Sequence, residues 1–129
     1  MNVAYVDASA LTKLILDEPD SGAMRRWYLE SERIVSSVIG VIETRRAVAR
    51  QTDSDERVDL ILRSVVTLEV DEAVARMAAT LTPSALRTLD AIHLASAQGL
   101  LGQLDAFVTY DDRLAHAARV VGLPVVRPA

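Results

Sequence analysis

The sequence predicts an α/β fold in which helices cover a parallel β-sheet. Short apolar runs rich in valine alternate with segments whose apolar residues recur at helical spacing, a pattern typical of parallel strands with helices on both faces. With 129 residues, 50% of them hydrophobic, the chain is long enough to bury one sizeable core. No linker or repeat interrupts it, so we expect residues 1–129 to form a single domain.

Local signals indicate where the elements begin and end. Pro19 stops the first helix because its ring cannot continue one, and Gly122 stops the last. Asp20, Ser21 and Asp71 offer helix caps. The expected elements are, in order, a strand at 3–6, a helix up to Pro19, a helix after Asp20 or Ser21, a strand at 34–36, a helix at 38–50, a helix from Asp53 or Ser54 with Asp53 and Glu56 at capping-box spacing, a strand at 65–70, a helix after Asp71, a long helix from Leu86 to near Gly99 or Gly102, a strand at 106–109, a helix at 114–121 and a strand at 125–126.

Composition narrows the classes of protein. The net charge of -4 argues against nucleic-acid binding through a general basic surface, so a polyanionic substrate needs local help. The absence of cysteine excludes disulfides and thiolate metal sites and fits a cytoplasmic protein. The chain start lacks the basic region of a signal peptide, and no apolar run approaches the roughly 20 residues that span a bilayer. We therefore expect a cytoplasmic protein with no membrane partner.

Four acidic residues, Asp7, Glu43, Asp90 and Asp111, are flanked by apolar sequence that is expected to form the core. Carboxylates there lose solvation, and two of them about 5 Å apart at an effective dielectric of about 20 repel by about 3 kcal/mol. A divalent cation offsets this repulsion, and hard oxygen ligands suit Mg²⁺ or Mn²⁺. These residues predict a metal-dependent enzyme that cleaves phosphodiester bonds.

The expected elements place two of these acids at one edge of the sheet. Asp7 follows the first strand and Asp111 the fourth, and open parallel sheets build their sites at the carboxyl ends of strands. Glu43 and Asp90 lie inside expected helices and join the others only if those helices pass over the same edge. Four unrelated caps or solvated charges are the alternative.

Five further residues are candidates for supporting roles. The hydroxyls of Ser9 and Thr109 lie near expected ligands and can orient a carboxylate, although capping or a turn bond explains them equally well. Arg46 and Arg87 each lie three residues from one of the acids and are candidates to contact an RNA phosphate, with a solvated helix face as the alternative. His93, one turn after Asp90, is expected to pack in the core.

Four segments occur in a fixed order. They are Asp7-Ala8-Ser9, Glu43 followed by Arg45 and Arg46, the run Leu89-Asp90-Ala91-Ile92-His93-Leu94-Ala95, and Thr109-x-Asp111 followed by a helix and Gly122. Together, in a chain of this length, they resemble a PIN-domain ribonuclease and, within that group, the VapC toxins of bacterial toxin–antitoxin pairs. The resemblance covers nearly the whole chain.

The resemblance implies a PIN-like fold of about four to five parallel strands with about seven helices. It implies that the four acids meet in one pocket that binds Mg²⁺ or Mn²⁺, with Asp7 and Asp90 as direct ligands and Glu43 and Asp111 ligating directly or through water. Asp112 competes for the fourth place. The Thr-x-Asp spacing favours Asp111 and leaves Asp112 as the cap of the last helix.

The resemblance also implies a function and partners. The chain is expected to be the toxin of a type II toxin–antitoxin pair, an endoribonuclease that uses metal-activated water and leaves 5'-phosphate ends. Its expected partners are RNA, a cognate VapB-like antitoxin and a second copy of itself in a homodimer. Two alternatives remain: a catalytically inactive PIN module that binds RNA or protein, and a receiver-type signalling domain, which needs a late lysine where this chain has only Lys13.

Overall fold

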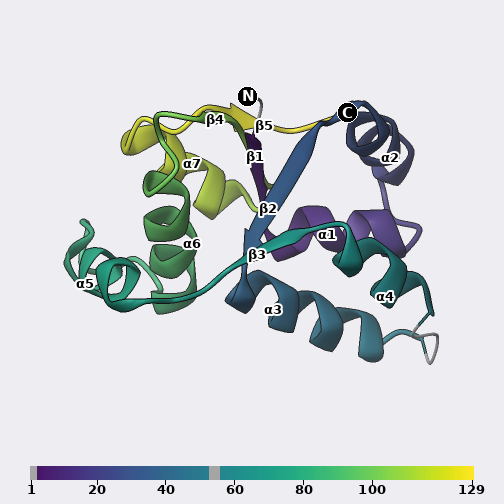
Figure 1. Ribbon diagram of the computed structural model, residues 1–129, viewed down its shortest axis with the longest axis horizontal. Helices are drawn as coiled ribbons and strands as arrows, with labels where there is room; N and C mark the ends of the chain where they lie inside the picture. The colour runs from purple at the N-terminus through teal and green to yellow at the C-terminus, as the bar shows by residue number, and fades with distance from the viewer. Residues whose placement is uncertain (1–2, 53–55) are drawn as a thin grey trace.

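A computed structural model, which describes residues 3–52 and 56–129, has a twisted parallel sheet at its centre (Figure 1). The strand order is β3-β2-β1-β4-β5, and all four neighbouring pairs are parallel. The first strand of the chain is therefore the middle strand of the sheet. The strands are β1 (Val3–Val6), β2 (Arg33–Ser37), β3 (Val66–Leu68), β4 (Leu104–Val108) and β5 (Val125–Val126).

Helices cover both faces of this sheet, as Figure 1 shows. The helices α1 to α4 lie on one side, and α5 to α7 lie on the other. This three-layer arrangement confirms the predicted α/β class with a parallel sheet. The helices are α1 (Ala8–Ile15), α2 (Ser21–Glu30), α3 (Val38–Ala49), α4 (Glu56–Arg63), α5 (Glu72–Thr80), α6 (Thr88–Gln98) and α7 (Asp112–Val120).

The alternation of side chains along β1 divides the interior into two cores. Ala4 and Val6 pack with residues of α1, α2 and α4, whereas Val3 and Tyr5 pack with residues of α6 and α7. All four are buried, as expected for a central strand covered on both faces. The Tyr5 ring stacks on Phe107 of β4 at a centroid distance of 5.2 Å. The carboxyl end of β1 is thus held firmly on both sides.

Some element boundaries differ from those that the sequence predicts. The third strand is shorter, at Val66–Leu68, and the long helix begins at Thr88 rather than Leu86. Asp71 caps α5 as expected, accepting a hydrogen bond from Val74 N at 2.9 Å. Asp20 precedes α2, but its φ of 69° turns it away from the capping geometry and its side chain makes no cap bond. The predicted helix start at 53 or 54 lies outside the described residues.

The helices of this fold are short, and many of them carry charged residues. In residues 3–52 and 56–129, every helix is too short or too polar to cross a bilayer.

Candidate functional site

The carboxyl ends of β1 and β4 bring the first and last candidate acids to one edge of the sheet. These strands are parallel neighbours with Val6 opposite Val108, and the Asp7 N–H donates to Val108 O at 3.2 Å. Residues that follow the two strands therefore emerge side by side, although about 100 positions separate them in the chain. The placement that the sequence predicts for Asp7 and Asp111 is what the structure shows.

Asp7 is buried and held by three neutral donors. Its Oδ1 accepts from Ser9 Oγ at 2.7 Å and from Ala10 N at 3.0 Å, and its Oδ2 accepts from Thr109 Oγ1 at 2.6 Å. Burial raises the pKa of the Asp7 carboxyl, and the hydrogen bonds from Thr109, Ser9 and Ala10 oppose that rise. Because none of these three donors carries a charge, a cation placed beside Asp7 would offset the cost of its burial.

The other three acids line one cavity of about 340 Å³, together with Arg87, Thr88 and Leu89. Arg87 lies across two of them: its Nε is 3.2 Å from Asp90 Oδ2 and its Nη2 is 3.7 Å from Asp111 Oδ2. Helices α3 and α6 do pass over the same edge, so Glu43 and Asp90 reach Asp111. Asp7 does not line this cavity.

In the part of the chain that the structure describes, no three acidic, histidine or cysteine side chains stand close enough to hold one metal ion as they lie. Carboxylates that repel one another stay apart until a cation draws them together, and here Arg87 supplies the positive charge between Asp90 and Asp111. The donor set nevertheless fits a hard divalent ion. All four acids offer oxygen, and the buried Asp7 has only uncharged partners.

The structure distinguishes the two neighbouring aspartates. Asp111 caps α7, with Oδ1 accepting from Arg113 N at 2.9 Å and Leu114 N at 3.1 Å, while its Oδ2 faces Arg87. The expectation that Asp112 caps the last helix is wrong, because α7 begins at Asp112 itself and the capping position before it is occupied by Asp111. The Asp112 side chain is 88% exposed and pairs with Arg127 at 2.5 Å. Asp111 is the acid that belongs to the cavity.

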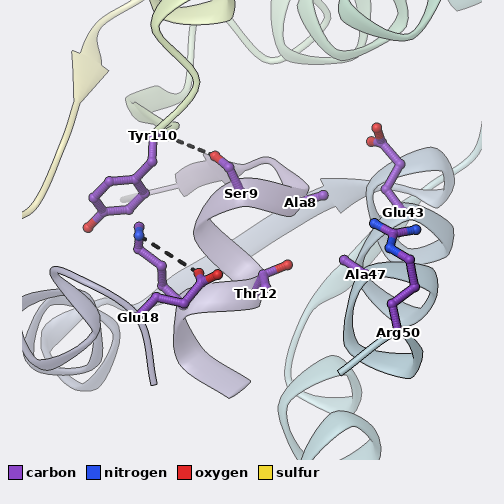
Figure 2. A pocket seen from close by; sticks show the side chains of 9 residues that line it. Ala8, Ser9, Thr12, Glu18, Glu43, Ala47, Arg50 and Tyr110 are labelled. Carbon is purple, nitrogen blue, oxygen red and sulfur yellow. Dashed lines mark hydrogen bonds and ion pairs between the residues drawn. The ribbon is translucent and has the colours of Figure 1, made fainter. Parts of the chain in front are cut away.

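A second cavity of about 410 Å³ adjoins the first through Glu43, which lines both. Figure 2 shows it as a trough between α1 and α3. Ser9 lies at its head and donates to Asp7 while accepting from Tyr110 N at 2.8 Å, so the hydroxyl ties β1 to the chain after β4. The lining residues are Ala8, Ser9, Thr12 and Lys13 of α1, Glu43 and Ala47 of α3, Arg50 directly after α3, and the loop residues Glu18 and Tyr110.

His93 has a role that the sequence did not reveal. The side chain is buried as predicted, but its contact is with Glu43 of α3 rather than with Asp90 of its own helix: His93 Nε2 lies 2.7 Å from Glu43 Oε1. Its Nδ1 lies 2.6 Å from the Tyr5 hydroxyl, whose pKa is raised far above its ordinary value by burial. The run from Leu89 to Ala95 marks His93, but only the packing of α6 against α3 identifies its partner.

Comparison with known proteins assigns the chain and its fold to a family. The PIN domain family matches residues 4–120. Ribonuclease VapC47 of Mycobacterium tuberculosis (strain CDC 1551 / Oshkosh) is 41% identical over 130 residues, which cover 96% of each chain. This chain belongs to the PIN-domain family of VapC ribonucleases. Ribonucleases of this family generally depend on a metal ion.

Two solved structures show the same VapC-like fold. Mycobacterium tuberculosis VapC20, described as a Sarcin-Ricin loop cleaving toxin, superposes with a TM-score of 0.75 at 15% identity and covers 97% of this chain and 99% of its own. A toxin–antitoxin complex from Klebsiella pneumoniae gives a TM-score of 0.73 at 22% identity, with 98% of both chains covered. PIN-family membership also removes the receiver-type alternative, which needs a late lysine where this chain has only Lys13.

Proposed function

We propose that the chain is the toxin of a type II toxin–antitoxin pair, a single PIN domain over residues 1–129 that acts in the cytoplasm as an endoribonuclease dependent on Mg²⁺ or Mn²⁺. The observation that carries the proposal is the meeting of Glu43, Asp90 and Asp111 around one cavity beside the buried Asp7. Similarity to VapC ribonucleases over 96% of the chain supports it.

Each acid has a distinct part in this proposal. Asp7 and Asp90 hold the metal ion directly, and Glu43 and Asp111 complete the site directly or through water. When bound, the ion supplies an activated water and neutralises charge on the scissile phosphate. Ser9 and Thr109 fix both oxygens of Asp7 through bonds of 2.7 and 2.6 Å, so they orient this ligand.

Arginines near the acids supply the local positive charge that the net charge of -4 does not. Arg46 and Arg50 line a cavity with Glu43 on the outer face of α3, and both are exposed. Arg87 is 57% exposed and pairs with Asp90 and Asp111. In our proposal Arg87, which would leave these carboxylates free to hold a metal ion, would contact an RNA phosphate, and Arg46 would contact a neighbouring phosphate.

We also propose that a cognate VapB-like antitoxin blocks this site and that the toxin is a homodimer. The cavity that Glu43, Arg46 and Arg50 line is a groove of about 340 Å³, and the apolar side chains of Ile39, Ile42 and Leu89 line it as well. Ile42 and Leu89 are 49% and 46% exposed. An antitoxin segment that covers these side chains and points a basic residue toward Glu43 fits this groove. We expect the gene for this antitoxin to be a short reading frame next to the gene for this chain.

The test is inducible expression with mapping of RNA 5'-phosphate ends. We compare the wild type with Asp7→Asn and Asp90→Asn, each of which removes one charge and keeps side-chain size. The wild type is expected to arrest growth and produce new 5'-phosphate ends, and both variants are expected to do neither. Asp112→Asn is the matched control, because this exposed residue pairs with Arg127 away from the cavity.

Purified protein separates catalysis from binding alone. Cleavage of total RNA is expected with Mg²⁺ and none is expected with EDTA. RNA binding without cleavage in Mg²⁺ would support the inactive-module alternative. Cleavage that persists in EDTA, or equal toxicity from Asp7→Asn, would refute the metal mechanism.

A further inference from the structure

A line of hydrogen-bonded side chains runs from the middle of the sheet to the wall of the cavity. The Tyr5 hydroxyl of β1 lies 2.6 Å from His93 Nδ1, and His93 Nε2 lies 2.7 Å from Glu43 Oε1. Tyr5 is 0% exposed, the His93 side chain 3% and the Glu43 side chain 32%. One end of the line therefore belongs to the core and the other to the site.

The His93 ring is held in place from several directions. The Tyr5 ring meets it edge-on at a centroid distance of 5.8 Å and an interplanar angle of 79°. On the α3 side the neighbour is Gly40, where an added Cβ would lie 3.2 Å from His93 Cε1 and would clash with Ser36 Oγ. The absence of a side chain at Gly40 lets α3 and the ring approach this closely.

The partners define one consistent arrangement of protons. A glutamate carboxylate can only accept, so in this pairing Nε2 carries a ring proton and donates it to Glu43. Nδ1 can then accept from the Tyr5 hydroxyl, whose oxygen in turn accepts from Ser37 N at 3.3 Å. Every polar atom on this line has a partner, and the direction of donation runs from the backbone to Glu43.

We propose that His93, anchored by Tyr5, is a positioning residue that fixes the carboxylate of Glu43 for metal binding. Glu43 reaches the cavity on a flexible side chain that can occupy several rotamers, and a bond from a buried, immobile ring removes most of that freedom. This role rests on the proposed function of the site. It explains why a histidine, rather than an apolar residue, occupies a position buried between β1 and α3.

Two substitutions of His93 test the role. His93→Gln keeps an N–H donor of similar reach, and His93→Leu fills the space without one. Titration calorimetry with Mn²⁺ is expected to show an affinity about 10–100-fold weaker for His93→Leu and within about threefold of the wild type for His93→Gln. Urea unfolding in EDTA measures the stability of each variant. Unchanged Mn²⁺ affinity in His93→Leu would overturn the proposal.

A double variant separates positioning from folding. His93→Leu alone leaves the proton of the buried Tyr5 hydroxyl without its acceptor, so it destabilises the protein for a reason unrelated to metal. The combination of Tyr5→Phe with His93→Leu removes both polar groups. We expect its stability to exceed that of His93→Leu while its Mn²⁺ affinity stays as weak. If the affinity instead recovers together with stability, His93 is purely structural.

The metal-free protein offers an independent readout. Long-range ¹H–¹⁵N NMR of the wild type in EDTA is expected to show the His93 proton on Nε2 and an unprotonated Nδ1. A proton on Nδ1 alone would contradict the proposed direction of donation. If the wild type neither binds Mn²⁺ nor cleaves RNA, the proposed function is wrong, and the positioning role of His93, which rests on it, is wrong as well. If the wild type does both and His93→Leu does so equally well, only the positioning role fails.

Discussion

Asp7→Asn is expected to abolish activity and yet stabilise the metal-free protein. Burial raises the pKa of the Asp7 carboxyl, so its charged form is less favourable in the folded than in the unfolded chain. Asparagine keeps the shape and removes the charge. Its carbonyl oxygen can accept from Ser9 and Ala10 as Oδ1 does, and its amide can donate to Thr109, whose hydroxyl also accepts.

The sign of the pH dependence follows from the direction of the pKa change. Between the unfolded pKa near 3.9 and the higher folded one, the folded protein binds more protons than the unfolded chain, so the free energy of unfolding of the wild type falls as pH rises. Each unit of pKa difference corresponds to about 1.4 kcal/mol. Asparagine does not titrate, so the advantage of the variant is absent at low pH and complete above the folded pKa of Asp7.

Thermal and urea unfolding in EDTA at pH 4 and pH 7.5 measure this difference. We expect Asp7→Asn to have a higher free energy of unfolding and a higher Tm than the wild type at pH 7.5, and the difference to be much smaller at pH 4. Asp112→Asn controls for the change in net charge. Adding Mn²⁺ is expected to raise the Tm of the wild type and not that of Asp7→Asn. A variant less stable than the wild type at pH 7.5 would refute the reasoning.

Three further substitutions test separate parts of the structure. Asp111→Asn is expected to lower the rate of RNA cleavage at least about tenfold, whereas Asp112→Asn is expected to leave it unchanged. An equal loss of cleavage in the two variants would show that Asp112 also belongs to the site. Gly40→Ala should lower the free energy of urea unfolding by about 1–3 kcal/mol, because its Cβ clashes with Ser36 Oγ; a gain would show that Ser36 rearranges freely. Asp71→Ala should cost about 1 kcal/mol through loss of the α5 cap and leave RNA cleavage unaltered, and a loss of cleavage in the folded variant would connect α5 to the site.

The order and class of the elements were predictable because they depend on local pattern. Valine-rich runs bounded by turn and cap residues predicted β1 and β5 at their observed bounds. The acids at strand ends followed from the same pattern, since parallel neighbours end at one edge. Elements with weaker patterns were predicted less well. The third strand is only Val66–Leu68, with two exposed residues out of three, so its burial signal is slight.

The sequence predicted that Glu43, Asp90 and Asp111 would meet, and they line one cavity, but it did not predict the contacts around them. That His93 pairs with Glu43, 50 positions away, depends on how α6 packs against α3, and the sequence indicated only that His93 is buried. The choice between Asp111 and Asp112 depended on where α7 starts, and its start at Asp112 is two residues before the predicted start at 114, a difference as large as that between methods of assigning helix ends. The pairing of Arg87 with two carboxylates likewise requires the relative placement of α6 and α7.

The hydrogen bond from Thr109 to Asp7 joins residues 102 positions apart, so it cannot form until both residues have been synthesised. A ribosome makes Asp7 102 residues before it makes Thr109, whose hydroxyl holds the carboxylate, and β4 is the strand that leads to Thr109. Until β4 inserts beside β1, the Asp7 carboxylate lacks its partner from Thr109. On this topology a nascent or truncated chain that lacks β4 and Thr109 is an incomplete nuclease, because the first of its four acids is not yet held in place.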